Sequence, residues 1–162
     1  DQTPGGTNQA LASVIENVLR RHRVRVFAQW EIADALRAKG MAEDFRAVPQ
    51  EGYLSTQGVW DQFRKEFDRL GMGIRKSILV AHPEHMFRCQ WLIGMDNIGV
   101  LIPNEAFGPC GGWSEFGCDV YGYDPKSVQP WTTSRGEFVG HEIAARLNAL
   151  RDRKSSFDTR TR

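Results

Sequence analysis

The chain has 162 residues, of which 41% are hydrophobic and 25% are charged, and its formal net charge is +1. These values are typical of a globular domain with a core of its own, and they argue against a general nucleic-acid binder, which needs an excess of positive charge on one face. No apolar run approaches the roughly 20 residues that a membrane span needs, so we expect no span in this chain.

The first half of the chain alternates between predicted helices and strands. Thr7 or Asn8 is suited to cap a helix, because apolar residues recur at helical spacing as far as Leu19. A strand is expected over residues 24–28, followed by a turn and a short helix over 32–39 that stops at Gly40. The loop over 41–55 is expected to contain a short strand near 46–48.

The second half continues the alternation. Ser55 or Thr56 is suited to cap a helix that ends at Gly71. A buried strand over 77–80 leads through a polar turn into a helix with Pro83 at its first position, and another buried strand covers 98–102. A last helix is expected over 135–153.

This alternation predicts right-handed crossovers between parallel strands. We therefore expect an α/β fold: a small three-layer Rossmann-like domain with a mostly parallel sheet flanked by helices. A single domain is expected over residues 1–154, with a flexible polar tail over 155–162.

The turn between the strand at 77–80 and its helix carries the strongest candidate site. It presents His82, Glu84 and His85, with Arg88 one helical turn further on. Binding sites of open α/β sheets lie at such strand ends, and the N–H groups at a helix start favour phosphate or carboxylate. Arg88 would clamp the anion, with His85 as hydrogen-bond donor or general acid/base. Alternatively, Arg88 pairs with Glu84 at i,i+4 spacing.

A metal site is the competing interpretation of the same turn. His82, His85 and Glu84 could bind a metal, because the two histidines are three residues apart and imidazole is a common zinc ligand. Glu142 or His141 could complete the shell. The simpler alternative is that one histidine caps a carbonyl and the other is solvated. Spacing alone rarely identifies a metal site, so we assign no metal ligand and leave the cofactor unknown.

The turn after the first strand carries two further candidates. Glu31 could act as an acid or base or bind a ribose hydroxyl, because a buried position raises the pKa of a carboxyl group. It could equally be a first-turn glutamate that interacts with the helix dipole. Trp30 could stack on a flat ligand ring, although most aromatics at strand ends belong to the core.

Three segments resemble the YdcF/SanA/ElyC-like domain, a family of largely unknown function. Residues 29–33 (QWEIA) match its Ser-Glu-Ala position, with Glu31 as the acid and Glu51 as the acid that follows. Ser55-Thr56 resembles its Thr helix start, and residues 79–88 (LVAHPEHMFR) resemble its strand and His-Met-x-Arg segment. Residues 58–59 are Gly-Val where the family has Glu-Asn. The resemblance implies a Rossmann-like fold with a small nucleotide-like or envelope-related ligand at the strand ends.

The leading functional hypothesis is a domain that binds a small anionic or nucleotide-like molecule at the carboxyl edge of its sheet. If it is an enzyme, hydrolysis or transfer at a phosphate-bearing substrate is the class that we expect. The candidate catalytic residues are His85 and Glu31, and the candidate ligand-binding residues are Arg88, His82, Thr56 and Trp30. The alternatives are a metal-dependent hydrolase through His82 and His85 and a non-catalytic interaction or oligomerisation module that uses the aromatic loop 107–131.

The cysteine content bears on location. The chain has three cysteines, and an odd count leaves at least one thiol unpaired, which favours a reducing compartment. The first residues show no secretory signal, so we expect a cytoplasmic protein. The partner that we expect is a small anionic ligand, and a homo-oligomer is the alternative partner.

Overall fold

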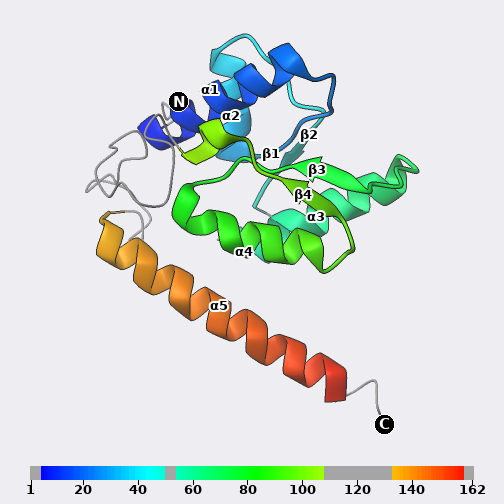
Figure 1. Cartoon of the computed structure of the whole chain (residues 1–162), viewed down its shortest axis with the longest axis vertical. Coiled ribbons are helices and arrows are strands. Elements are labelled where there is room, and N and C mark those ends of the chain that lie inside the picture. Colours follow the sequence, from blue (N-terminus) through cyan, green and yellow to red (C-terminus); the bar gives the residue numbers. More distant parts are fainter. Residues whose placement is uncertain (1–4, 50–53, 108–132, 159–162) are drawn as a thin grey trace. The chain divides into compact units, whose positions relative to one another are not determined.

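The computed structural model describes residues 5–49, 54–107 and 133–158 (Figure 1). The chain divides into two compact units, Asp1–Gly122 and Tyr123–Arg162. The first unit contains, in chain order, α1 (Gly6–Arg21), β1 (Phe27–Gln29), α2 (Trp30–Ala38), β2 (Phe45–Ala47), α3 (Thr56–Arg69), β3 (Lys76–Ile78), α4 (Pro83–Gly94), β4 (Gly99–Leu101) and the short 3₁₀ helix η1 (Asn104–Phe107). The second unit contains α5 (Arg135–Asp158). The expectation of one domain over residues 1–154 stays a prediction.

The described strands pair in parallel, as the alternation of helices and strands predicts. β1 pairs with β2, with Phe27 opposite Phe45, and β3 pairs with β4, with Ser77 opposite Val100. The α/β class and the parallel pairing are thus confirmed. The hydrogen-bonded ladders form two separate two-stranded sheets instead of the one continuous sheet that we expected.

Strands β1, β3 and β4 are shorter than predicted, whereas β2 has the predicted length and begins one residue earlier. Side chains bind backbone groups at the ends of the β1–β2 ladder. The Val26 N–H donates to the Asp44 carboxylate at 2.7 Å, so the β1–β2 ladder begins only at Phe27 and not at residue 24. At the other end of β2, the Gln62 side chain accepts from the Val48 N–H and donates to the Val48 carbonyl, at 3.1 and 2.8 Å. Both backbone groups of Val48 are therefore satisfied outside the sheet.

Local capping signals explain the helix starts. The Ser55 hydroxyl accepts from the Gly58 N–H at 3.0 Å, so the prediction of a cap at the start of α3 is confirmed. Pro83 occupies the first turn of α4, also as predicted. The prediction that Thr7 or Asn8 caps the first helix is wrong, because α1 already begins at Gly6 and has no side-chain cap.

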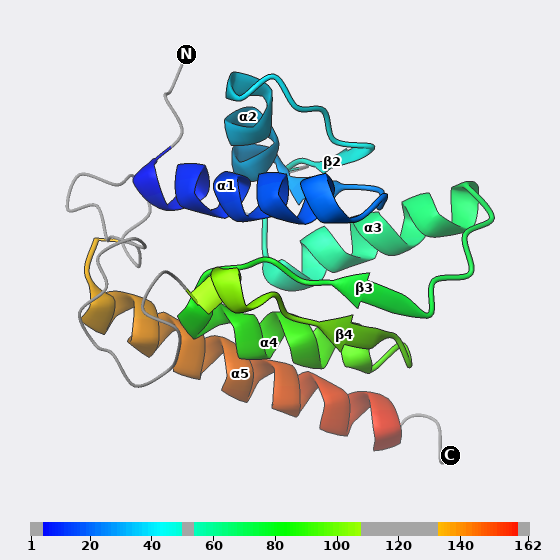
Figure 2. The same cartoon turned by 45° about the horizontal axis from the view of Figure 1, so that its top comes forward.

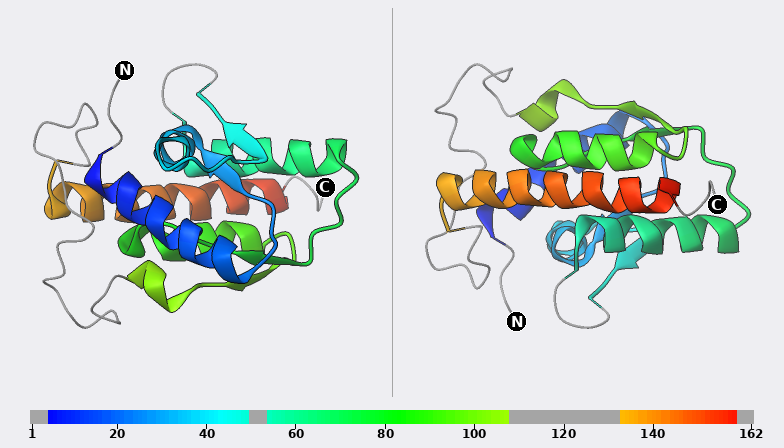
Figure 3. Two further views of the ribbon diagram at one scale, coloured as in Figure 1. Left: turned by 90° about the horizontal axis from the view of Figure 1, so that it is seen from above. Right: turned by 90° about the horizontal axis from the view of Figure 1, so that it is seen from below.

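Helices cover both sides of the strands in the first unit. α1 and α2 lie on one side, and α3 and α4 lie side by side on the other (Figures 2 and 3). Ala28 of β1 is buried against α1 and α2, whereas its neighbour Phe27 packs against Trp60 and Phe67 of α3. Successive side chains of a strand point to opposite faces, so β1 contributes to a core on each side.

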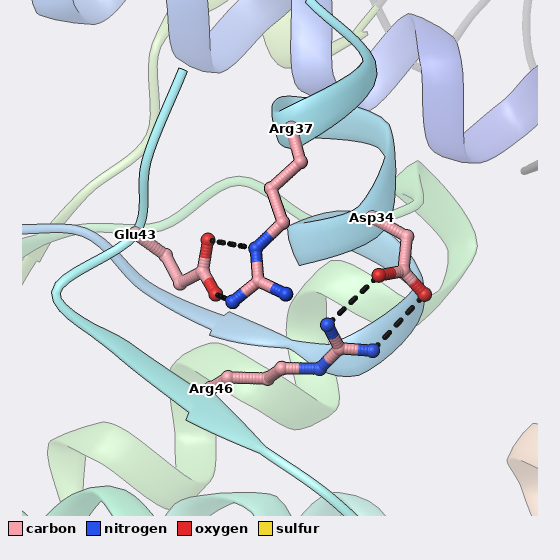
Figure 4. Close-up of polar contacts among 4 residues, drawn as sticks. All are labelled: Asp34, Arg37, Glu43 and Arg46. Carbon is pink, nitrogen blue, oxygen red and sulfur yellow. Dashed lines mark hydrogen bonds and ion pairs between the residues drawn. The ribbon is translucent and has the colours of Figure 1, made fainter. Parts of the chain in front are cut away.

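Four charged side chains form ion pairs between α2 and the segment made of β2 and the loop before it (Figure 4). Arg46 of β2 makes two contacts with Asp34 of α2, at 2.8 and 3.0 Å, and Arg37 pairs with Glu43. Two-point contacts between arginine and carboxylate fix geometry as well as charge. The pairs link β2 and the loop before it to the helix that follows β1.

The second unit is a single long helix over its described residues. Its start at Arg135 agrees with the prediction, and the Ser134 hydroxyl accepts from the Glu137 N–H at 3.3 Å. Most of the aromatic loop 107–131 lies outside the described residues. In the part of the chain that the structure describes, no helix is both long and apolar enough to cross a membrane.

Candidate functional site

The candidate site lies where α3 and α4 begin. In chain order, α3 comes after the carboxyl end of β2 and α4 comes after the carboxyl end of β3. The two helices are in contact, so residues of their first turns can meet. A helix start presents N–H groups that have no partner within the helix, together with the positive end of the helix dipole.

Thr56 and His85 form the link between the two helix starts. Thr56 is the first residue of α3 and His85 lies in the first turn of α4, and 29 positions of sequence separate them. The Thr56 Oγ1 atom lies 3.3 Å from His85 Nε2, and both side chains are half-buried. The structure therefore brings together two residues that we selected from separate sequence segments.

Arg88 joins this pair from one turn further along α4. Its Nη2 atom lies 3.1 Å from His85 Nδ1, and only 9% of the residue is exposed. A buried guanidinium keeps its charge, so it places a positive charge beside the two helix starts. Thr56, His85 and Arg88, which we call the α3–α4 cluster, form the polar centre of the candidate site.

His82 has a structural role at the same helix. It is the N-cap of α4, and its Nδ1 atom accepts from the Glu84 N–H at 3.3 Å. Its carbonyl accepts from the N–H groups of His85 and Met86, each at 2.9 Å. His82 thus fixes the turn that orients His85. The simpler interpretation of the turn is wrong, because His82 caps an N–H group and not a carbonyl, and His85 is half-buried and in contact with Thr56 and Arg88.

Glu31 and Trp30 are the first two residues of α2. Burial raises the pKa of the Glu31 carboxyl, and this effect outweighs the hydrogen bonds from its own N–H and from Gln29. Asp34 raises that pKa further and Arg46 lowers it. Within the described residues, Glu31 Oε2 is buried without a hydrogen-bond partner. The use of Glu31 and Trp30 by the same ligand as the α3–α4 cluster stays a prediction.

Our reasoning from the sequence missed Asp34 and Arg46 as neighbours of Glu31. Asp34 follows Glu31 by three positions in a helix, so a helical wheel would have found it. Arg46 reaches Glu31 only through the parallel pairing of β1 and β2, which local spacing does not encode.

The geometry gives little support to a metal site in the turn. Among the residues that the structure describes, no three His, Cys, Asp or Glu side chains gather where they could hold a metal ion. His82 Nδ1 and both ring nitrogens of His85 are engaged in hydrogen bonds. A metal would have to displace these hydrogen bonds, because a ligating imidazole nitrogen must be unprotonated and open.

Comparison with known proteins finds no match among protein-family models, curated proteins or solved structures. The case for a function therefore depends on the residues themselves.

Proposed function

We propose that this chain is a Rossmann-like domain, related to the YdcF/SanA/ElyC-like family, that binds a small phosphate-bearing molecule where α3 and α4 begin. The contact between Thr56 and His85, at 3.3 Å, carries the proposal because it joins the two helix starts at one point. Two helix N-termini that meet beside an arginine provide positive potential and directed donors, which suit a phosphate group.

The charges near the cluster favour an anion over a neutral ligand. Arg88 contributes a full positive charge, and each helix start contributes roughly half a charge. Glu84 lies in the first turn of α4 and offsets part of this charge. The remaining potential is positive, which fits a ligand with one phosphate.

The ligand class that we propose is a nucleotide-like phosphate ester. The basis for the nucleotide-like part is the family resemblance of residues 79–88 together with parallel strands that are followed by helices. If the protein is an enzyme, hydrolysis or transfer at the phosphate is the reaction class that fits this ligand.

Calorimetric titration of the full chain with adenosine monophosphate and with adenosine tests this function. The key variant is Arg88→Met, which removes the charge while retaining an unbranched side chain in a buried position. Arg69→Met is the matched control, because Arg69 is exposed and pairs with Glu66 at the far end of α3.

We expect adenosine monophosphate to bind the wild type and Arg69→Met equally, and Arg88→Met at least about tenfold more weakly, as is usual when a charged hydrogen-bonding group is lost. Adenosine should bind the wild type, Arg69→Met and Arg88→Met with the same low affinity. Circular dichroism shows whether Arg88→Met is folded. Equal nucleotide binding by a folded Arg88→Met would refute the proposal.

A further inference from the structure

The hydrogen-bond directions within the α3–α4 cluster follow from the chemistry of its members. A guanidinium has five N–H donors and no acceptor, so Arg88 Nη2 must donate to His85 Nδ1 across 3.1 Å. A ring nitrogen that accepts carries no proton. The neutral His85 ring therefore carries its proton on Nε2, and a doubly protonated ring would set two cations in contact.

This tautomer also determines which atom donates in the hydrogen bond between His85 and Thr56. The His85 Nε2–H faces Thr56 Oγ1 at 3.3 Å, so the hydroxyl oxygen accepts. A hydroxyl that accepts still has its own hydrogen, which can rotate toward another acceptor. The chain of hydrogen bonds thus runs from Arg88 through His85 to Thr56, and it ends in a donor.

This order is opposite to the one that activates a nucleophile. In a serine or threonine nucleophile system, the histidine nitrogen that faces the hydroxyl must be unprotonated to take its proton. A carboxylate on the other ring nitrogen enforces that tautomer. Here the group on Nδ1 is a cation, Arg88, which enforces the other tautomer.

We propose that Thr56 donates a hydrogen bond to the ligand and is not a covalent nucleophile, and that Arg88 is the positioning residue that sets the tautomer of His85. The ligand group that faces Thr56 must then be an acceptor, such as a phosphate oxygen, and neither an amine nor another obligate donor. This inference rests on the proposed function for the identity of the ligand. The hydrogen-bond order itself is a property of the protein without ligand.

Nuclear magnetic resonance of the full chain without ligand tests the hydrogen-bond order. In mildly alkaline buffer, a long-range proton–nitrogen correlation spectrum distinguishes protonated from unprotonated ring nitrogens, and His85→Gln assigns the signals. We expect His85 with its proton on Nε2 in the wild type and in Arg69→Met, and a mixture of tautomers in Arg88→Met. A proton on Nδ1 in the wild type would overturn the inference.

Two variants of Thr56 test the ligand contact. Thr56→Ser retains the hydroxyl and should bind adenosine monophosphate within about threefold of the wild type. Thr56→Val retains the shape without the donor and should lose about tenfold or more, with no change for adenosine. Equal binding by Thr56→Val would overturn the donor role.

The binding test and the tautomer test together distinguish a failure of the proposed function from a failure of the hydrogen-bond order. If adenosine monophosphate does not bind at all while the His85 proton is on Nε2, the proposed function fails and the hydrogen-bond order stands. If it binds and depends on Arg88 but the proton is on Nδ1, the order fails and the function stands.

Discussion

Arg88 Nη2 lies 3.1 Å from His85 Nδ1, so a buried cation and a neutral imidazole share one hydrogen bond within a single turn of α4. Because Arg88 can only donate, His85 Nδ1 must accept, and the proton of the ring is then on Nε2. Thr56, at the start of the neighbouring helix, receives that second hydrogen bond. The contact between Arg88 and His85 therefore determines the order of hydrogen-bond donors and acceptors in the candidate site.

Replacement of Glu84 with glutamine should strengthen the binding of phosphate. Glu84 lies in the first turn of α4, where its negative charge stabilises the helix but repels an anion at the same end. We expect Glu84→Gln to raise the affinity for inorganic phosphate about two- to fivefold, as measured by titration at low salt. Asp68→Asn, which removes one charge from the far end of α3, should leave it unchanged. A weaker affinity in Glu84→Gln would contradict an anion site at this helix start.

Stability should depend on pH through Glu31. Burial raises the pKa of Glu31 above its ordinary value of 4.5, so the folded state holds this proton more tightly than the unfolded state. The protonated carboxyl stabilises the fold below that ordinary value, and the benefit is lost as the pH rises through the raised pKa. Glu31→Gln cannot ionise, so its stability relative to the wild type should increase over that interval. Urea titrations at a series of pH values measure the difference, and a constant difference would argue against the raised pKa.

Removal of the Ser55 cap should destabilise α3. The Ser55 hydroxyl satisfies the Gly58 N–H at 3.0 Å, so Ser55→Ala should cost about 1 kcal/mol in the free energy of unfolding. Ser55→Asp retains an oxygen that can accept this bond and should cost much less. Urea unfolding followed by circular dichroism compares the two, and an unchanged Ser55→Ala would show that the cap contributes nothing.

Asp96 should matter for stability because it satisfies a buried indole. The Trp60 Nε1–H donates to the Asp96 carboxylate at 2.7 Å, which joins α3 to the turn after α4. Asp96→Ala leaves that N–H without its acceptor and should cost about 1–3 kcal/mol. Asp96→Asn keeps an acceptor oxygen and serves as the control in the same urea titrations. Equal stability of the alanine and asparagine variants would mean that the hydrogen bond is unimportant.

Signals that act within a few residues could be predicted from the sequence. The serine before α3 and the proline at the start of α4 act on backbone groups within one helical turn, so their roles are local. The His82 cap belongs to the same class. These features place the start of each helix that carries the candidate site.

Features that depend on the paths of distant segments could not be predicted in the same way. The Asp44 side chain binds the Val26 N–H and the Gln62 side chain binds both backbone groups of Val48, across 18 and 14 positions of sequence. Nor does any local pattern encode the contact between Thr56 and His85, which were selected together only through a family resemblance. Burial and the order of hydrogen bonds depend on such contacts. The order of hydrogen bonds in the α3–α4 cluster could therefore be derived only from the structure.

A crystal structure of the full chain with adenosine monophosphate tests the central claim most directly. The account predicts a phosphate oxygen within hydrogen-bond distance of Thr56 Oγ1, with His85 still between Thr56 and Arg88. A nucleotide bound elsewhere, or one that turns its sugar and base toward Thr56 with the phosphate in solvent, would contradict it.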